Sequence, residues 1–544
     1  MATNSSGDRR DPPNGCPGDD DIILSLEQIP EIDTPVRVLE LGERILAPED
    51  LVHAALRNPD VTLEAFGEAG ARAAHDDGRL VAFVHPLTGE STVLPVLESL
   101  KANPDIGILA TRAARDMVRN TSLFPQDDTQ LVPLDPVVLN AARHERDSER
   151  NGPAEPVLAY VRLQRQVDEF AVFGPGTRAM GVFDGGGVLR GLSHRWRPAT
   201  SIALRMPSRP RTDIAAAIRA QLADAAETAR VTVDSVKPAY YDSGGRYLQP
   251  VYNYTATLTF RNDDLHAADR RLTGFVAFGE ELEPLPVIGT QTGPSPTEPH
   301  DGCDDDPDDM APAPPGDPTV GRYVVRKDAQ GWVDSANNFL GALRMAGFLG
   351  SHIPFTDTQY YWAEPFEFLS DKNRFVNAVD IALNEVHGNW GLFSTRDNAD
   401  DLVRLQDVPE GGYDKLSYWI LHSCEVIPTT TDETTSFDVW WNIFQGMRAA
   451  VGYRTEMWIN DGVTTPFGLF LGLGAPVVSA WFSSIAANSN YGANDTTYRD
   501  GNRGIDEPMG RASAVTVCGH SDDTATNIGS VGPAQCLTEW WFDN

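Results

Sequence analysis

The apolar positions of the N-terminal half repeat with two periods, one typical of strands and one typical of helices. Short apolar runs bounded by glycine, proline or acidic residues predict strands, and two pairs of these strands form hairpins. The predicted strands cover residues 81–84, 91–94, 157–163, 169–173, 178–183, 188–192, 231–236 and 251–260, and the predicted helices cover residues 106–118 and 214–229. Helices and strands mixed in this way indicate an α+β arrangement.

Two apolar strands predicted in the C-terminal region each end at a reactive side chain. Residues 378–391, AVDIALNEVHGNWG, lead into His387, and residues 416–427, LSYWILHSCEVI, lead into Cys424. The chain between these two side chains is long enough for a crossover, and residues 396–408 offer a helix for it. The two strands are therefore expected to be parallel neighbours in an α/β sheet, with both side chains beyond their carboxyl ends.

A change in composition separates the two regions. Residues 290–319 hold eight prolines and eight acidic residues with almost no large apolar side chain, so a solvated linker is expected there, and it is a plausible processing point. The expected organisation is a disordered leader at 1–20, an N-terminal α+β region at 21–104, α+β modules at 105–288, the linker at 289–319 and an α/β domain at 320–544.

Charge and hydropathy narrow the possible partners and the location. The chain of 544 residues has a formal charge of −34, which repels polyanions, so no nucleic-acid partner is expected. Residues 466–487 lack charged side chains but contain several glycines and serines, and they are expected to be buried in the protein and not to cross a membrane. The first twenty residues lack the apolar core of a secretory signal, so a cytoplasmic location is expected, with secretion by another route left open.

The five cysteines are widely scattered and lack the spacing of a metal finger, so no disulfide framework is expected. Cys518 and Cys536 would stay free thiols in a reducing compartment, whereas in an exported protein they could pair.

A thiol and an imidazole at one sheet edge can act together in nucleophilic catalysis. A cysteine attacks as the thiolate, and a nearby histidine stabilises that anion or protonates the leaving group. In this interpretation Cys424 attacks an amide or ester carbonyl, His387 transfers the proton, and backbone N–H groups beginning with that of Gly388 stabilise the oxyanion. This chemistry needs no cofactor.

A metal site is an alternative use of the same two strands. Glu385 and His387 share one face of the first strand, and His422 and Cys424 share one face of the second. Zinc accepts such a set of ligands, although no CxxC or HExxH spacing supports it. A purely structural role is also open, because a cysteine at the end of an apolar strand is often a small buried hydrophobic residue.

Asn460 and Asp461 are candidates for substrate binding. They follow an apolar strand predicted at 453–459, and they could line a pocket that selects a basic group. An Asn-Asp-Gly sequence is also a common surface turn, which is the favoured interpretation here.

Part of the N-terminal half resembles the pro-segment modules that precede many secreted peptidases. Residues 159–198, AYVRLQRQVDEFAVFGPGTRAMGVFDGGGVLRGLSHRWRP, contain a VFGPG turn and a glycine-rich hairpin like those of such modules. Residues 247–258, YLQPVYNYTATL, are similar to the companion module usually found beside it. The resemblance extends over about 106–260 and implies a half that inhibits a peptidase, assists its folding or serves as plain scaffold.

The C-terminal region resembles the caspase, gingipain and clostripain group of cysteine peptidases, in which one apolar strand ends in His-Gly and a later one ends in a small residue and Cys. The corresponding pieces here are EVHG, with His387, and LHSC, with Ser423 and Cys424. Residues 320–544 also resemble an uncharacterised bacterial family that carries VHG, LHSCEVIP and GYRTEMWINDGVTTPFG. These resemblances imply a caspase-like α/β fold with a mostly parallel sheet flanked by helices, although no clear substrate-pocket signature accompanies them.

The hypothesis that these observations support is a cysteine peptidase-like hydrolase acting on a peptide or a small amide or ester, with an N-terminal half that inhibits it or helps it fold. One alternative is a domain of the same fold that acts in small-molecule biosynthesis or as a binding scaffold, and another is the zinc site. No oligomeric state is predicted.

Overall fold

The computed structural model divides the chain into two compact units. The first unit comprises Met1–Leu39, Ile202–Tyr241 and Gln249–Gln291, and the second comprises Glu40–Ser201, Asp242–Leu248 and Thr292–Asn544. The structure describes residues 21–43, 50, 52–53, 62–66, 71–85, 88–98, 100–120, 123–124, 127–146, 148, 152–260, 270–286, 299–301, 316–326, 329–348, 354–395, 401–432, 436–457, 462–487, 497–500 and 502–543. The predicted leader and most of the predicted linker lie outside the described residues.

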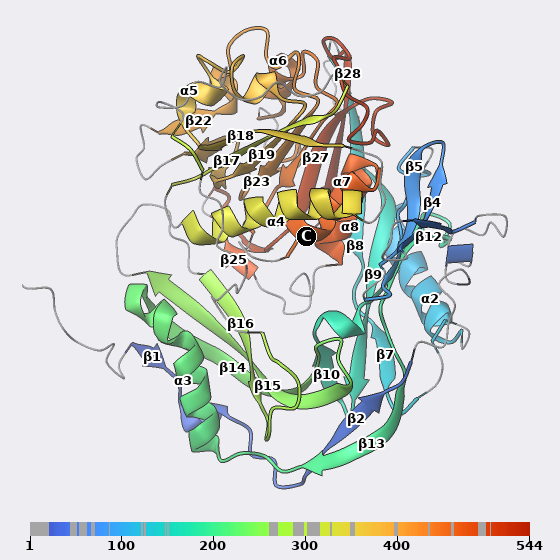
Figure 1. The fold of residues 1–544 in the computed structure, drawn as a ribbon, viewed down its shortest axis with the longest axis vertical. Helices are drawn as coiled ribbons and strands as arrows, with labels where there is room; N and C mark the ends of the chain where they lie inside the picture. Colours follow the sequence, from blue (N-terminus) through green and yellow to red (C-terminus); the bar gives the residue numbers. More distant parts are fainter. Residues whose placement is uncertain are drawn as a thin grey trace, which may run out of the picture. The chain divides into compact units, whose positions relative to one another are not determined.

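The first unit packs one helix on antiparallel strands (Figure 1). Its main elements are α3 (Arg211–Thr228), β14 (Ala229–Asp242), β15 (Tyr247–Phe260) and β16 (Arg270–Ala277), with the short parallel strand β1 (Ile22–Ile23) beside β14. Ile214, Ile218 and Leu222 recur at every fourth position of α3 and are fully buried. This apolar stripe explains why the segment is a helix that covers one side of the strands. The strands β2 (Val36–Leu41) and β13 (Ala199–Met206), like β14 and β15, have residues in both units.

The second unit is built on one continuous sheet, in which the strands between residues 319 and 453 pair in parallel and the other strands pair antiparallel. In spatial order its strands are β18 (Thr356–Trp362), β17 (Thr319–Val324), β19 (Ile381–Glu385), β23 (Tyr418–His422), β24 (Ala449–Tyr453), β27 (Ala512–Val517), β28 (Cys536–Phe542), β8 (Val137–Glu145), β9 (Glu155–Val167), β11 (Ala179–Asp184), β12 (Leu189–His194), β6 (Ser91–Val93), β5 (Arg79–Val84), β4 (Ala71–Asp76) and β3 (Glu64–Phe66). Smaller ribbons are formed by β7 (Gln130–Pro133) and β10 (Phe170–Phe173) against β9, by β20 (His387–Asn389), β21 (Leu392–Ser394) and β22 (Leu402–Arg404), and by β25 (Thr497–Arg499) and β26 (Asp506–Pro508).

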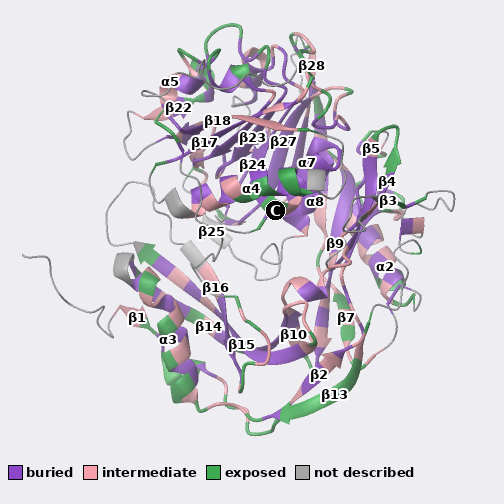
Figure 2. Ribbon diagram, viewed as in Figure 1, coloured by how far each residue is buried: buried purple, intermediate pink, exposed green. Residues whose placement is uncertain are grey.

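Helices cover both faces of the parallel part of the sheet (Figure 1). One face carries α4 (Ala329–Phe348), α7 (Thr464–Gly472) and α8 (Val477–Ala486), and the other carries α5 (Pro365–Phe368) and α6 (Val439–Ile443). Consecutive side chains of β17 point to opposite faces of the sheet. Arg322 donates to Asn337 of α4 at 3.0 Å, whereas the ring of Tyr323 meets Phe368 of α5, with the ring centres 5.3 Å apart. The strands between these layers are buried along their length, as the purple ribbons of Figure 2 show. The second unit therefore has a mixed α/β fold.

Most elements that the apolar pattern predicts in the N-terminal half are present. The helix α2 covers Ile106–Val118 as expected, β5 pairs with β6, and β11 pairs with β12. The segment predicted to be buried at 466–487 forms α7 and α8, which are almost entirely enclosed. None of the helices in the described part of the chain is both long and apolar enough to span a membrane.

Two predicted elements of the C-terminal region are wrong. Residues 396–408 do not form a helix where they are described, because residues 402–404 pair as β22 with β21 and residues 405–407 form a short 3-10 turn. The strand predicted at 453–459 was placed too late in the sequence, because the observed strand β24 covers Ala449–Tyr453. In both segments the pairing partner, which the local pattern does not reveal, decides the structure.

The division into units differs from the expected order of domains. β28 at the end of the chain pairs with β8 along its whole length, from Cys536 opposite Glu145 to Phe542 opposite Leu139. The ring of Phe542 also packs against Tyr160 of β9 at 5.1 Å. The region expected as modules at 105–288 is therefore split, and its first part continues the sheet of the C-terminal strands instead of forming a separate module.

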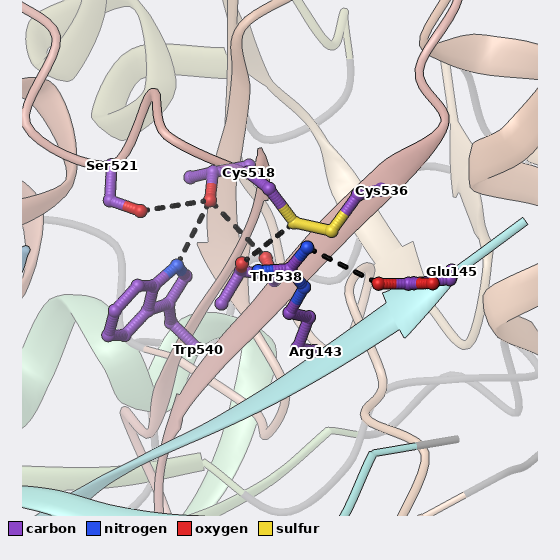
Figure 3. The surroundings of a disulfide bond; sticks show 8 residues. Arg143, Glu145, Cys518, Ser521, Cys536, Thr538 and Trp540 are labelled. Carbon is purple, nitrogen blue, oxygen red and sulfur yellow. Dashed lines mark hydrogen bonds and ion pairs between the residues drawn. A yellow bond between two sulfur atoms is a disulfide. The ribbon is translucent and has the colours of Figure 1, made fainter. Parts of the chain in front are cut away.

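Cys518 and Cys536 form a disulfide at the end of the β27–β28 pair (Figure 3). The backbone N–H of Cys518 donates to the carbonyl of Cys536 at 3.1 Å, and Thr538 Oγ1 lies 3.5 Å from the sulfur of Cys518. Strand pairing places the two Cα atoms 5.5 Å apart, which is the usual spacing for a disulfide. The pairing that the sequence allowed for an exported protein is thus present, because the strand register brings together two cysteines that are 18 residues apart.

Candidate active site

His387 and Cys424 follow the ends of two neighbouring parallel strands. In the register of β19 with β23, Glu385 lies opposite His422, so each candidate residue comes two positions beyond a paired residue. On the face that carries α4, α7 and α8, the ring of His422 meets Trp481 of α8 and the ring of His387 meets Trp332 of α4. Both are half-buried, whereas the residues before them are fully enclosed. The structure thus brings the two sequence-predicted residues to one edge of the sheet.

Gly388 allows the two strand ends to approach each other closely. A Cβ atom built on Gly388 would lie 2.1 Å from Ser423 Oγ and 2.3 Å from the carbonyl oxygen of Cys424. Any side chain at this position would therefore collide with the backbone beside the thiol. Glycine is therefore needed at position 388 for steric reasons, whatever chemistry the site performs.

The chain turns sharply immediately after Cys424. Glu425 has a φ of 50°, in the left-handed region that residues other than glycine rarely adopt. Its N–H donates to the carbonyl of Thr455 at 3.1 Å, which holds the turn against the loop after β24. Backbone conformations of this kind are found most often at functional sites, where the surrounding structure imposes them.

The sulfur of Cys424 has a backbone donor. The N–H of Met457 lies 3.4 Å from Sγ, and the carbonyl of Met457 lies 3.8 Å from it. The sulfur therefore lies beside both a backbone donor and a backbone acceptor of the same residue. Among the described cysteines, Cys424 is the one that is not in a disulfide.

An aromatic side chain from α4 packs against the imidazole of His387. The ring of Trp332 is fully buried and meets that of His387 edge-on, with the centroids 5.3 Å apart. The same indole lies 6.3 Å from His422. Trp332 therefore limits the orientations of His387 and separates it from the apolar core below.

A buried polar pair lies beneath the two candidate residues. His422 Nδ1 is 2.6 Å from Glu385 Oε2, and both side chains are 1% exposed or less. Burial raises the pKa of Glu385, and the opposing influences of His422 and of a hydrogen bond from Ser335 do not cancel this effect. Ser335 Oγ in turn lies 3.0 Å from Thr464 Oγ1, which links α4 with α7. This pair fixes the two strand ends relative to the helices above them.

The four side chains of the metal alternative do not gather into a ligand set. Glu385 and His422 are engaged with each other below the surface, whereas His387 and Cys424 lie half-buried beyond the strand ends. Within the part of the chain that the structure describes, no group of three or more histidine, cysteine, aspartate and glutamate side chains is placed to hold a metal ion. This geometry gives the zinc alternative no support.

A loop far along the chain closes the outer side of the site. Asn502 Nδ2 donates to Asn389 Oδ1 at 2.7 Å and to Glu425 Oε2 at 3.2 Å, so it joins the segments after both candidate residues. The guanidinium of Arg503 lies 5.5 Å from the ring centre of Trp390. These contacts could not be predicted from the sequence, because nothing in the local pattern at 500–504 connects that loop with segments more than 75 residues earlier.

A buried ionic cluster supports the same loop. Asp432, of which 1% is exposed, accepts hydrogen bonds from Arg454, Arg503 and the backbone N–H of Thr429. Burial on its own would raise the pKa of Asp432, but the hydrogen bond and charge of Arg454 lower it below the ordinary value. The carboxylate is therefore ionised at neutral pH and ties the turn after Cys424 to the loop that carries Asn502.

Asn460 and Asp461, the predicted substrate-binding residues, lie outside the described residues. Trp332 and Met457, which contact the candidate residues, were also missed from the sequence. A tryptophan in an amphipathic helix and a backbone N–H after a strand carry no signal of such a role in the sequence.

Comparison with known proteins adds little about activity. Residues 322–513, from β17 to β27, match the model of a domain of unknown function, DUF6345. No curated protein matches the chain. A solved structure of an uncharacterised protein from Eubacterium rectale ATCC 33656 is 8% identical, with a TM-score of 0.27, over 46% of this chain and 86% of that one.

Proposed function

We propose that this protein is a cysteine hydrolase in which Cys424 is the nucleophile and His387 the general acid and base. The observation that carries the proposal is the position of both residues directly beyond the ends of adjacent, in-register parallel strands. The left-handed turn at Glu425 and the N–H of Met457 near the sulfur support it further. The parallel order of β17, β19, β23 and β24 also supports a caspase-like arrangement of this part of the chain.

The reaction follows from the chemistry of the two side chains. The thiolate of Cys424 attacks the carbonyl carbon of an amide or ester, and a bond forms between Sγ and that carbon. The oxyanion is stabilised by backbone N–H groups near Gly388 and Cys424. The bond to the leaving nitrogen or oxygen then breaks as the protonated His387 donates a proton to it. Water, deprotonated by His387, then attacks the acyl-enzyme, and the bond between Sγ and the acyl carbon breaks to restore the thiolate and the protonated His387.

We further propose that the N-terminal strands of the second unit assist folding and are not a removable inhibitor. β8 pairs with every residue of β28, and without β8 this long edge strand would be open to other chains. Cleavage between residues 302 and 315 would then leave both pieces bound to each other. We expect the cut protein to elute as one species in size-exclusion chromatography, and separation without denaturant would contradict this role.

The location is part of the proposal. The sequence favours the cytoplasm, but the bond between Cys518 and Cys536 favours an oxidising compartment, where disulfides persist. The resemblance of the N-terminal half to modules of secreted peptidases is in accord with export.

The first experiment is selective alkylation of unreduced protein. A low concentration of iodoacetamide is expected to label Cys424 faster than Cys16 and Cys303, and His387→Ala should remove that preference. His520→Ala is the matched control, because His520 is a partly exposed histidine that bonds with Asp523 in a different loop. Slow and equal labelling of the three thiols would refute an activated nucleophile.

A second measurement tests catalysis itself. A library of peptide and ester substrates is screened with the wild type and with Cys424→Ser, which keeps the size of the side chain but is a far weaker nucleophile in this setting. Activity that survives in Cys424→Ser would assign the hydrolysis to another group.

A further inference from the structure

The second unit contains a pocket that is separate from the candidate active site. It lies between the strands β5, β6, β11 and β12 and the helices α7 and α8, and it is partly open to solvent. Most of its wall is apolar and includes Phe83, Met180, Leu192, Leu469 and Phe470. A mostly apolar lining with a few polar groups is typical of sites for small organic ligands.

The helical wall of the pocket carries two buried hydroxyl groups. Ser483 and Ser484 of α8 both line the pocket, and they are 5% and 2% exposed. Neither Oγ atom has a hydrogen-bond partner among the described residues. A serine in a helix commonly bonds to the carbonyl one turn earlier, and a buried hydroxyl without a partner is unfavourable. A ligand oxygen in the pocket would supply the missing partner.

The charged groups of the pocket are already paired. Arg178 Nη1 donates to both carboxylate oxygens of Glu90, at 2.9 and 3.2 Å, and Ser193 Oγ donates to the same carboxylate at 2.9 Å. A charged ligand would have to break this pair or remain uncompensated. His85 at the rim is held by the N–H of Thr88, and burial lowers its pKa, so it adds no positive charge at neutral pH.

The structure assigns this pocket to an uncharged molecule that has an apolar chain and one hydroxyl or carbonyl oxygen. The chain occupies the space between the strands and α7, and the oxygen bonds with Ser483 and Ser484. The pocket is not the candidate active site, because His387 and Cys424 do not line it. Trp481 of α8 packs against His422, with the ring centres 6.2 Å apart.

The test measures binding of the probe 1-octanol to the full chain by isothermal titration calorimetry. Octanoate and octylamine have the same chain with a negative or positive end. A single saturable phase is expected for 1-octanol, and binding of the two charged probes is expected to be at least about tenfold weaker. The absence of saturable octanol binding, or tighter binding of a charged probe, would overturn the assignment.

Three variants of the pocket and one control variant test whether 1-octanol binds in this pocket. Ala487 lies at the partly exposed rim, and Ala487→Phe should fill the mouth and weaken octanol binding at least about tenfold. Ala216→Phe makes the same change on an exposed face of α3 and should leave it unaltered. Ser483→Ala and Ser484→Ala should each weaken binding about three- to tenfold without lowering the melting temperature, because each removes an unpaired hydroxyl. Unchanged binding in Ala487→Phe, or in both serine variants, would refute this placement.

Discussion

Replacing Gly388 by alanine tests the geometry on which the proposed active site depends. The added methyl group would lie 2.1 Å from Ser423 Oγ and 2.3 Å from the carbonyl oxygen of Cys424, well inside van der Waals contact. The serine hydroxyl can rotate, but the carbonyl belongs to the backbone and can move only if the strand end moves. Overpacking of this kind costs about 1–3 kcal/mol, and the backbone contact places Gly388→Ala near the upper end of that range.

The assay is urea unfolding followed by tryptophan fluorescence. With a slope of about 3 kcal/mol per molar urea, a loss of about 3 kcal/mol lowers the midpoint of the second unit by about 1 M. Gly341→Ala is the matched control, because this exposed glycine lies within α4 and a Cβ there meets no atom within 4 Å. The control should be stabilised by about 0.5–1 kcal/mol, the helical preference of alanine over glycine.

Two results would refute the reasoning. A midpoint of Gly388→Ala equal to that of the wild type would mean that the two strand ends do not approach as closely as described. A destabilised variant that still shows fast, His387-dependent labelling of Cys424 would separate the close approach from the reactivity of the thiol.

Glu385→Gln is expected to gain stability relative to the wild type as the pH rises from about 4.5 to 8. Burial raises the pKa of Glu385, so the wild type loses folding stability over this range, whereas the glutamine does not ionise and still accepts from His422. Thermal unfolding at a series of pH values measures the difference in stability between variant and wild type, and a difference that shifts in favour of the wild type as the pH rises would contradict the direction of this pKa shift. Asp432→Asn should cost about 1.5–3 kcal/mol, because it removes a charged hydrogen-bond acceptor that Arg454 and Arg503 share, although Glu507 still pairs with both, and chemical unfolding at pH 7 should show the loss. The lowered pKa of Asp432 means that its contribution is present above the ordinary carboxyl range and is lost as the pH falls through the folded pKa, so the difference between wild type and variant should shrink in acid. Replacing both Cys518 and Cys536 by serine should lower the stability by about 3 kcal/mol for a closed loop of this length, and equal unfolding midpoints with and without reductant in the wild type would argue that the bond is absent.

The sequence by itself determined the local elements and the two candidate residues. The apolar spacing of α2 and the glycine-rich turn between β11 and β12 are local signals, and the structure contains both elements. The strands before His387 and Cys424 are also apparent from continuous apolar runs, and their parallel pairing follows from the long connection between them. Buried parallel strands carry such runs because both of their faces are covered by helices.

Only the tertiary structure decided which distant segments meet. The pairing of β28 with β8 joins the end of the chain to a region expected as a separate module, and it could not be predicted because strand pairing depends on partners hundreds of residues apart. The same holds for the disulfide, which the strand register creates, and for Asn502, which crosses from a remote loop to Asn389 and Glu425. Hydrophobic periodicity reports how a segment is buried, whereas the identity of its neighbours is set by the packing of the whole chain.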